Sequence, residues 1–229
     1  MQECGLMLRH GVQFHWRNHG YADFDGFLAT LNHDKRKKIK QERRHVRDAG
    51  ISCAWFAGSA ITDALWVFFN RCYRETYRQH HSTPYLNLDF FRAIGRTMPE
   101  NILLIVAMRA SKPVAASLNI HGGRRLCGRY WGALEYHQAL QFETCYYQVI
   151  EFCIAHGIAS FEGGAQGKHK IARGLLPVET HSAHWLAHPR FAAAVEDFLR
   201  RESRSIAAHV DELGSHSPFK PDGSKATTP

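Results

Sequence analysis

The middle of the sequence constrains the fold more strongly than any other part. Residues 102–108 form a continuous apolar run and residues 113–120 place apolar side chains at every second position, so each segment is typical of a β-strand. Gly122 and Gly123 then give the signal of a tight hairpin turn, before a third strand that we predict over 125–132. Together these segments predict a three-stranded antiparallel meander.

A helix and another strand follow the meander. Residues 142–155 carry apolar side chains at helical spacing, and His156-Gly157 end that pattern. Residues 158–162 again read as a strand. A helix that crosses over between two strands favours their parallel placement. We therefore predict a mixed α+β fold in which a mostly antiparallel central sheet is flanked by helices.

The rest of the chain extends this fold without an internal repeat. We predict a single domain over residues 1–213 and a disordered tail over 214–229, which is rich in Ser, Pro, Lys and Thr. Further strands are expected within 1–21, at 51–57 and at 178–186. Further helices are expected from Asp23, from Asp34 to Ala49, from Thr62, from Asp89 to Met98 and from Pro189 onward.

Positive charge is concentrated in one of these helices. The net charge is +8, and eight of the 29 basic residues lie in the helix 34–49. Such a surface points to an anionic partner, for example a nucleic acid. A solvated helix face that binds nothing is the structural alternative.

A glycine-rich basic stretch follows the strand 158–162. Residues 159–174 place four glycines among Gln166, Lys168, His169, Lys170 and Arg173, directly after Glu162. Glycine lets the backbone approach a ligand, and Lys and Arg donate to phosphate or carboxylate oxygens. The composition favours a binding site over its alternative, an exposed polar loop.

Cysteine usage and the N-terminal sequence suggest the compartment. The six cysteines include no CxxC pair, and neither an export signal nor a run of about 18 apolar residues occurs. We therefore predict a cytoplasmic protein with reduced thiols and no membrane span. A zinc site built from Cys153, His181 and His184 lacks ligand spacing, so we expect no metal.

Several short motifs occur in one order along the chain and carry a resemblance. They include Gln13-Phe14-His15-Trp16, Gly128-Arg129-Tyr130-Trp131-Gly132, Phe161-Glu162 with Gly164-Ala165-Gln166-Gly167, and Ser182-Ala183-His184-Trp185. Together they resemble a family of bacterial predicted N-acyltransferases related to the FemAB peptidoglycan-bridge enzymes, within the GNAT superfamily. Because the relatives carry a further N-terminal half, the chain resembles the C-terminal half of a longer two-half protein.

The resemblance implies transfer of an acyl or aminoacyl group from acyl-CoA or aminoacyl-tRNA to an amine. The acceptor would be a small molecule or a cell-wall precursor in peptidoglycan or cell-envelope metabolism. Such chemistry needs a splayed pair of strands, a donor for the oxyanion and a base. The strands 125–132 and 158–162 are the natural pair. Glu162 is the first choice for the base or amine-positioning carboxylate, Glu143 is the second, and His169 is an alternative carrier of protons.

A structural ion pair with Arg129 or Arg173 is the alternative role for either glutamate. Tyr130 and Trp131 alternate across their strand, so one can wall the acyl pocket while the other packs on the core. The GNAT pyrophosphate loop is missing from residues 133–140, which leaves aminoacyl-tRNA open as the donor. The predicted donor-binding residues are Arg129, Tyr130, Trp131, Gly164, Gln166, Lys168, Lys170 and Arg173.

Other roles remain open alongside the enzyme. The basic helix 34–49 could bind tRNA as a positioning surface, or the chain could be a non-catalytic module for RNA or a cell-envelope polymer. A homodimer, in which a second copy replaces the absent half, is a further expectation that a sedimentation mass would test.

Overall fold

The computed structural model of the protein describes residues 5–220, apart from the side chains of 204–205, 207–209 and 211. The chain divides into two compact units. The central unit is Arg17–Glu162, and the ribbon unit joins the residues up to Trp16 with those from Gly163 onward. The sequence pattern, which predicts one domain, carries no sign of this division.

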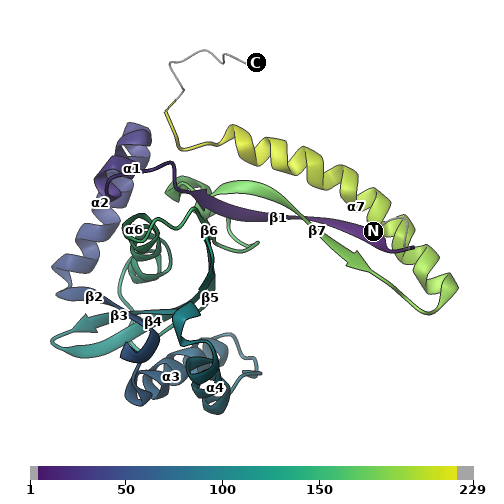
Figure 1. The fold of residues 1–229 in the computed structure, drawn as a ribbon. Helices are drawn as coiled ribbons and strands as arrows, with labels where there is room; N and C mark the ends of the chain where they lie inside the picture. The colour runs from purple at the N-terminus through teal and green to yellow at the C-terminus, as the bar shows by residue number, and fades with distance from the viewer. Residues whose placement is uncertain (1–4, 221–229) are drawn as a thin grey trace. The chain divides into compact units, whose positions relative to one another are not determined.

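Five strands form the sheet of the central unit (Figure 1). They follow the spatial order β2 to β6, and all neighbours are antiparallel except β5 and β6, which are parallel. The predicted meander, the parallel last strand and the mixed α+β class with a mostly antiparallel sheet are confirmed. The strands are β2 (Ile51–Ala57), β3 (Ile102–Arg109), β4 (Lys112–Gly122), β5 (Arg125–Ala133) and β6 (Ser160–Glu162).

The continuous apolar run of the sequence forms the most buried strand. Residues 102–107 of β3 are 0% exposed because helical segments cover both faces of the sheet. One face packs against α3 (Asp63–Gln79) and α4 (Leu88–Thr97). The other face packs against α2 (His33–Asp48) and the helical segment that begins at Leu140. This two-sided burial explains why β3 shows no alternation of apolar and polar residues.

Side-chain caps set the starts of the helices. Asp23 caps α1 (Phe24–Thr30) and Thr62 caps α3, both at the predicted starts. The predicted start of α2 at Asp34 is wrong, because Asn32 is the N-cap. The Oδ1 atom of Asn32 accepts a hydrogen bond from the backbone N–H of Lys35 at 3.0 Å, so the helix begins at His33.

The predicted single helix 142–155 is irregular near its start. It comprises α5 (Leu140–Phe142), a π-helical segment η4 (Glu143–Tyr147) and α6 (Gln148–Ala155). A π-helical turn brings residues five apart onto one side. As a result, the Nε2 atom of Gln148 donates a hydrogen bond to Oε1 of Glu143 at 2.8 Å. Two 3₁₀ segments complete the unit, η2 (Gly58–Ala60) and η3 (Pro99–Asn101).

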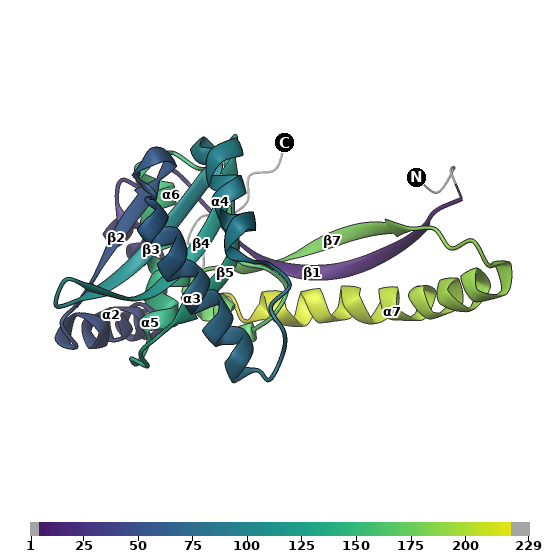
Figure 2. The ribbon, with the colours of Figure 1, turned by 90° about the horizontal axis from the view of Figure 1, so that it is seen from below.

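The ribbon unit is built on one long antiparallel pair. Strand β1 (Met7–Arg17) pairs with β7 (Leu176–His184), from Met7 opposite His184 to His15 opposite Leu176. The short helix η5 (Lys168–Arg173) precedes β7, and the long helix α7 (Pro189–Ser215) runs alongside the ribbon (Figure 2). Strand β7 begins at Leu176, two residues before the start of the predicted strand 178–186.

The C-terminal end departs from the predicted boundary. Helix α7 continues to Ser215, Pro218 is buried and Phe219 forms a β-bridge, although the sequence predicts a tail from residue 214. The remainder of that predicted tail, residues 221–229, lies outside the described residues. Among residues 5–220, no helix combines the length and the apolar composition needed to cross a bilayer.

Candidate functional site

The parallel strands β5 and β6 pair over only three residues and then part. Arg125 lies opposite Ser160, and Cys127 lies opposite Glu162 at the last paired position. Strand β5 continues to Ala133, so its later residues have no partner in the β6 ladder. The strands 125–132 and 158–162, which the resemblance singles out as the pair for the acyl group, are therefore hydrogen-bonded only at their beginnings.

A β-bulge lies at the same point on the opposite edge of β5. Leu118 of β4 faces Tyr130, whereas the next residue, Asn119, faces Gly128, so Arg129 is the extra residue. A bulge redirects side chains and strengthens local twist, and bulges are common beside active sites. Strand β5 therefore changes its direction where β6 leaves it.

The carboxylate of Glu162 lies at the point of parting. Its Oε2 atom accepts a hydrogen bond from Cys127 Sγ at 3.4 Å, and its Oε1 atom lies 3.2 Å from Arg125 Nε. The Glu162 side chain is 20% exposed, so solvent or a substrate can reach it. Burial, followed by the charge of Glu162, raises the pKa of the Cys127 thiol to about 11. Cys127 thus stays protonated near neutral pH and donates to the carboxylate.

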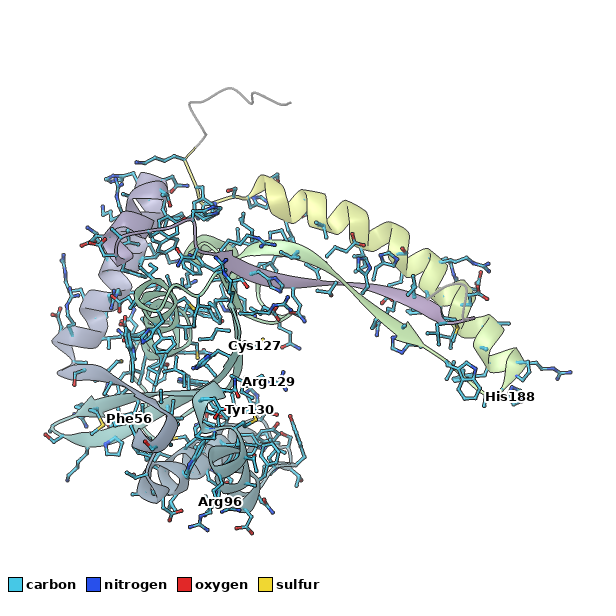
Figure 3. All side chains as sticks on the ribbon, in the orientation of Figure 1. Phe56, Arg96, Cys127, Arg129, Tyr130 and His188 are labelled. Atoms are coloured by element: carbon cyan, nitrogen blue, oxygen red, sulfur yellow. The ribbon has the colours of Figure 1, made fainter. Side chains whose placement is uncertain are left out.

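Tyr130 faces the core that β5 shares with α3 and α4. Its ring meets Tyr73 edge-on at 5.2 Å, and its hydroxyl lies 2.6 Å from that of the exposed Tyr85. The Arg129 guanidinium lies 5.7 Å from the Tyr130 ring centroid, and Figure 3 shows Cys127, Arg129 and Tyr130 in succession along β5. Burial and then the bond to Tyr85 raise the pKa of Tyr130, so its hydroxyl remains a proton donor.

Trp131 lies on the other side of the strand and lines a hollow. Its Nε1 atom donates to Oγ1 of the buried Thr144 at 2.8 Å, which fixes the indole ring. The hollow has a volume of about 360 Å³ and is lined by Trp131, Gln79 and residues 133–142. Its size is that of a small-molecule site. The hollow is lined by residues 133–140, the segment in which the sequence lacks a GNAT pyrophosphate motif.

Glu143, the second predicted base, has a different environment. It is 5% exposed, and its two oxygens accept hydrogen bonds from Arg43 Nη2 at 2.9 Å and Nε at 3.1 Å. The same guanidinium also donates to Glu151 at 2.8 Å and 3.0 Å. The ion-pair alternative therefore fits Glu143, with Arg43 as the partner where the sequence suggests Arg129 or Arg173.

The basic helix α2 has two distinct faces. Arg43 faces inward and joins α2 to η4 and α6, and the buried Glu42 accepts a hydrogen bond from the hydroxyl of Tyr147. The outward side chains line a hollow of about 610 Å³: His33, Arg36, Lys37, Lys40, Gln41 and Arg44. This surface is the anion-binding candidate that the charge run predicts.

The glycine-rich basic stretch belongs to the ribbon unit and divides into buried and exposed residues. Gly164 and Gly167 have φ angles of 80° and 100°, which favour glycine. Lys170 and Arg173 are 6% and 3% exposed; Lys170 Nζ lies 3.4 Å from the Gly164 carbonyl, and Arg173 Nη1 donates to the His169 carbonyl at 2.7 Å.

Lys170 and Arg173 therefore shape the loop around η5. The side chains of Gln166, Lys168 and His169 are exposed. Of the predicted site residues, the structure groups Arg129, Tyr130, Trp131 and Glu162 around the parting of β5 and β6. Tyr85, Gln79 and Thr144 also touch this region and were missed, because they come from elements whose placement no sequence motif indicates.

Comparisons with known proteins bear on the fold and the family. L-PGS from Bacillus licheniformis has a TM-score of 0.59 and 9% identity; the match covers 84% of this chain and 67% of that one. FemX has a TM-score of 0.59 and 9% identity, with coverages of 81% and 64%. A C-terminal domain (DUF2156), assigned to a lysylphosphatidylglycerol synthetase from Agrobacterium fabrum, has a TM-score of 0.54 and 10% identity, with coverages of 75% and 53%.

At such low identity these likenesses concern the fold. The chain spans 53% to 67% of the length of these three proteins. No curated protein matches the sequence. The model of one family, described as FemAB-like peptidoglycan biosynthesis/recognition, matches residues 1–221. The predicted resemblance is thereby confirmed, and the chain belongs to the FemAB-like family.

Proposed function

We propose that the protein transfers an acyl or aminoacyl group from an activated donor to an amine of a cell-envelope precursor. The observation that carries this proposal is the parting of β5 and β6 directly after Cys127 and Glu162, with the Glu162 carboxylate at that point. The family's description supports a peptidoglycan precursor as the source of the amine.

The donor would bind along β5. Between Gly128 and Ala133 the strand has backbone groups that the β6 ladder does not use, and these can hold the acyl carbonyl. Trp131 and the hollow of residues 133–142 would accommodate the rest of the donor's reactive end. Backbone N–H groups beside the bulge at Arg129 would stabilise the oxyanion, because fixed dipoles act strongly in a site that excludes water.

Glu162 would act on the acceptor. The amine nitrogen attacks the carbonyl carbon, Glu162 takes the amine proton, and the tetrahedral intermediate expels a thiolate or a ribose oxygen, which is then protonated. Cys127 and Arg125 keep the carboxylate in place for this step. Glu143 has no part in it, because it is only 5% exposed and both of its oxygens accept hydrogen bonds from the inward-facing Arg43. The exposed Gln166, Lys168 and His169 remain candidates for donor phosphates, and His169 for carrying protons.

The decisive experiment replaces Glu162 by Gln, which keeps the side-chain shape and removes the base. We expect the single-turnover rate of transfer to fall by roughly 10² to 10⁴, with an unchanged thermal midpoint. Glu100→Gln, an exposed acid on η3, is the matched control and should retain the rate. Retention of the full rate by Glu162→Gln would remove the assignment of the base.

The identity of the donor can be tested separately. A donor at about 100 times its dissociation constant adds roughly 2.7 kcal/mol, which should raise the melting midpoint of a chain of this size by about 5 to 10 °C. The melt would be recorded with acyl-CoA and with aminoacyl-tRNA. The name of the lysylphosphatidylglycerol synthetase neighbour denotes an aminoacyl product, which favours aminoacyl-tRNA. A shift with acyl-CoA alone would reverse that choice.

A second candidate function rests on α2. Its outward basic residues line one continuous hollow, so the chain could bind RNA or an anionic cell-envelope polymer without catalysis. Replacing Lys37, Lys40 and Arg44 by Gln should weaken RNA binding and lower the slope of log K against log salt by about one for each lost phosphate contact. Lys112→Gln, an exposed lysine on β4, is the control. RNA binding without any transfer would favour this second function.

A further inference from the structure

Three side chains with metal-binding atoms share one face of the ribbon. His10 of β1 lies directly opposite His181 of β7, and Glu179 precedes His181 by two residues. Cross-strand partners and residues two apart on a strand point to the same face. The register of the β1–β7 pair therefore brings two imidazoles and one carboxylate together from separate parts of the sequence.

The distances within this cluster are short. The ligand atoms of His10, Glu179 and His181 all lie within 4.8 Å of one another. His10 Nδ1 is 2.5 Å from Glu179 Oε1, and the two imidazole rings meet edge-on with their centroids 4.9 Å apart. Among the residues that the structure describes, no other group of three or more such side chains is this compact.

The donor set matches a known coordination chemistry. Two imidazole nitrogens and one carboxylate oxygen are borderline ligands that suit Zn²⁺ and related divalent metals. Metal–ligand bonds of about 2.0 to 2.2 Å place tetrahedral ligands about 3.4 Å apart. For such an ion the widest separation in the cluster, up to 4.8 Å, would have to close by about 1.4 Å, and the 2.5 Å separation of His10 Nδ1 and Glu179 Oε1 would have to open by about 0.9 Å. Glu179 and His181 are exposed side chains.

An ion pair between His10 and Glu179 alone explains less of the cluster's geometry than a metal site does. A hydrogen bond between His10 and Glu179 needs only one imidazole, yet a ring nitrogen of a second, His181, lies within 4.8 Å of the same carboxylate. The zinc set considered from sequence differs: Cys153 belongs to the central unit, and His184 Nε2 lies 2.8 Å from Ser182 Oγ.

We propose that His10, Glu179 and His181 bind one divalent transition-metal ion of the Zn²⁺ class. The ion would link β1 to β7 and keep at least one coordination position for water, because the chain supplies three ligands. This site lies within the ribbon unit and is independent of the proposed transfer reaction. Its effect would be structural, since it joins strands that are 169 residues apart at His10 and Glu179.

The test is a titration of the full chain, without an affinity tag and after chelator treatment, with Zn²⁺ alone. We expect one equivalent to bind per chain, and Co²⁺ in its place to give the visible absorption of a low-symmetry site. Glu179→Gln and His181→Ala should each weaken Zn²⁺ binding at least tenfold. His184→Ala is the matched control, because it removes a nearby histidine of the same strand, and it should bind as the unmodified chain does.

Hydrogen exchange gives a second readout. Zn²⁺ should slow exchange of the β1 and β7 amides around His10, and EDTA should reverse the effect. Glu179→Gln, an exposed and isosteric change, keeps the test valid if a histidine variant fails to fold. Two results would overturn the proposal: no stoichiometric binding by the unmodified chain, or equal affinity of the Glu179→Gln and His184→Ala variants.

Discussion

Arg43 determines which acidic side chains are free for chemistry. Its guanidinium donates four hydrogen bonds, two to Glu143 and two to Glu151, where Glu143 is 5% exposed. A buried carboxylate has lost its hydration, and without a partner no ion pair or hydrogen bond compensates for that loss. Arg43 is therefore a structural residue, although it belongs to the most basic helix of the chain.

We predict that Arg43→Met destabilises the protein by about 3 to 5 kcal/mol, because it leaves Glu143 buried and unpaired with Arg43. Urea denaturation measures this as a lower midpoint. Arg47→Met, an exposed change on the same helix, should alter the free energy of unfolding by less than about 0.5 kcal/mol. Equal effects of the two variants would contradict the structural role of Arg43.

The same residues show how far the sequence could predict the site. The position of Glu162 at the end of a strand could be predicted, because a strand-like segment ends there and the glycine-rich stretch follows. The environment of Glu143 could not, since its partner Arg43 lies 100 residues away and the π-helical turn η4 changes the spacing. Apolar periodicity assumes regular turns, so it gives no warning that Glu143 and Gln148 are in contact.

At the scale of elements, β5 can lie directly against α3 because Gly132 has no side chain. A Cβ atom on Gly132 would lie 2.1 Å from the Cys72 carbonyl oxygen and 2.9 Å from Thr76 Oγ1. Thr76 also donates a hydrogen bond to the Trp131 carbonyl at 2.9 Å. Helix α3 thus contacts the strand backbone directly, in the segment that would hold the donor.

We predict that Gly132→Ala destabilises the protein by at least about 1 to 3 kcal/mol, because the clash involves backbone atoms that cannot rotate away. The rate of transfer should also fall, because β5 must move away from α3 to relieve the clash. Gly122→Ala is the control: a Cβ there meets nothing within 4 Å, and Gly122 is not among the glycines of positive φ. Thermal melts of both variants decide the matter, and similar midpoints would mean that α3 yields easily.

Most elements were predictable because local patterns agreed with their burial. The meander follows from an apolar run, an alternating strand and a Gly-Gly turn, all of which the structure contains. The start of α2 was wrong by two residues because Asn32 and Asp34 are both good caps, and the sequence does not rank them. The division into two units depends on β1 and β7, whose paired residues lie 161 to 177 positions apart in the sequence and leave no local signal.

At the scale of the molecule, buried thiols couple the fold to alkaline pH. Burial raises the pKa of Cys53, Cys72 and Cys153 to about 12, from an ordinary value of 9.0. The unfolded chain therefore releases thiol protons above about pH 9 that the folded chain retains. The resulting stability is complete below pH 9 and is lost as the pH rises toward 12, because the folded state binds more protons.

We therefore predict a melting midpoint that falls steadily between pH 8.5 and 10.5, values chosen as about half a unit below and about one and a half units above the ordinary thiol pKa. Other groups titrate in this range, so the contribution of the thiols needs a differential measurement. The double variant Cys72→Ala and Cys153→Ala should melt lower at neutral pH, because each change leaves a small cavity, but its midpoint should fall less steeply with pH. Parallel slopes for the two proteins would show that these thiols ionise as easily in the folded chain as in the unfolded one, and that the core around α3 and α6 admits water.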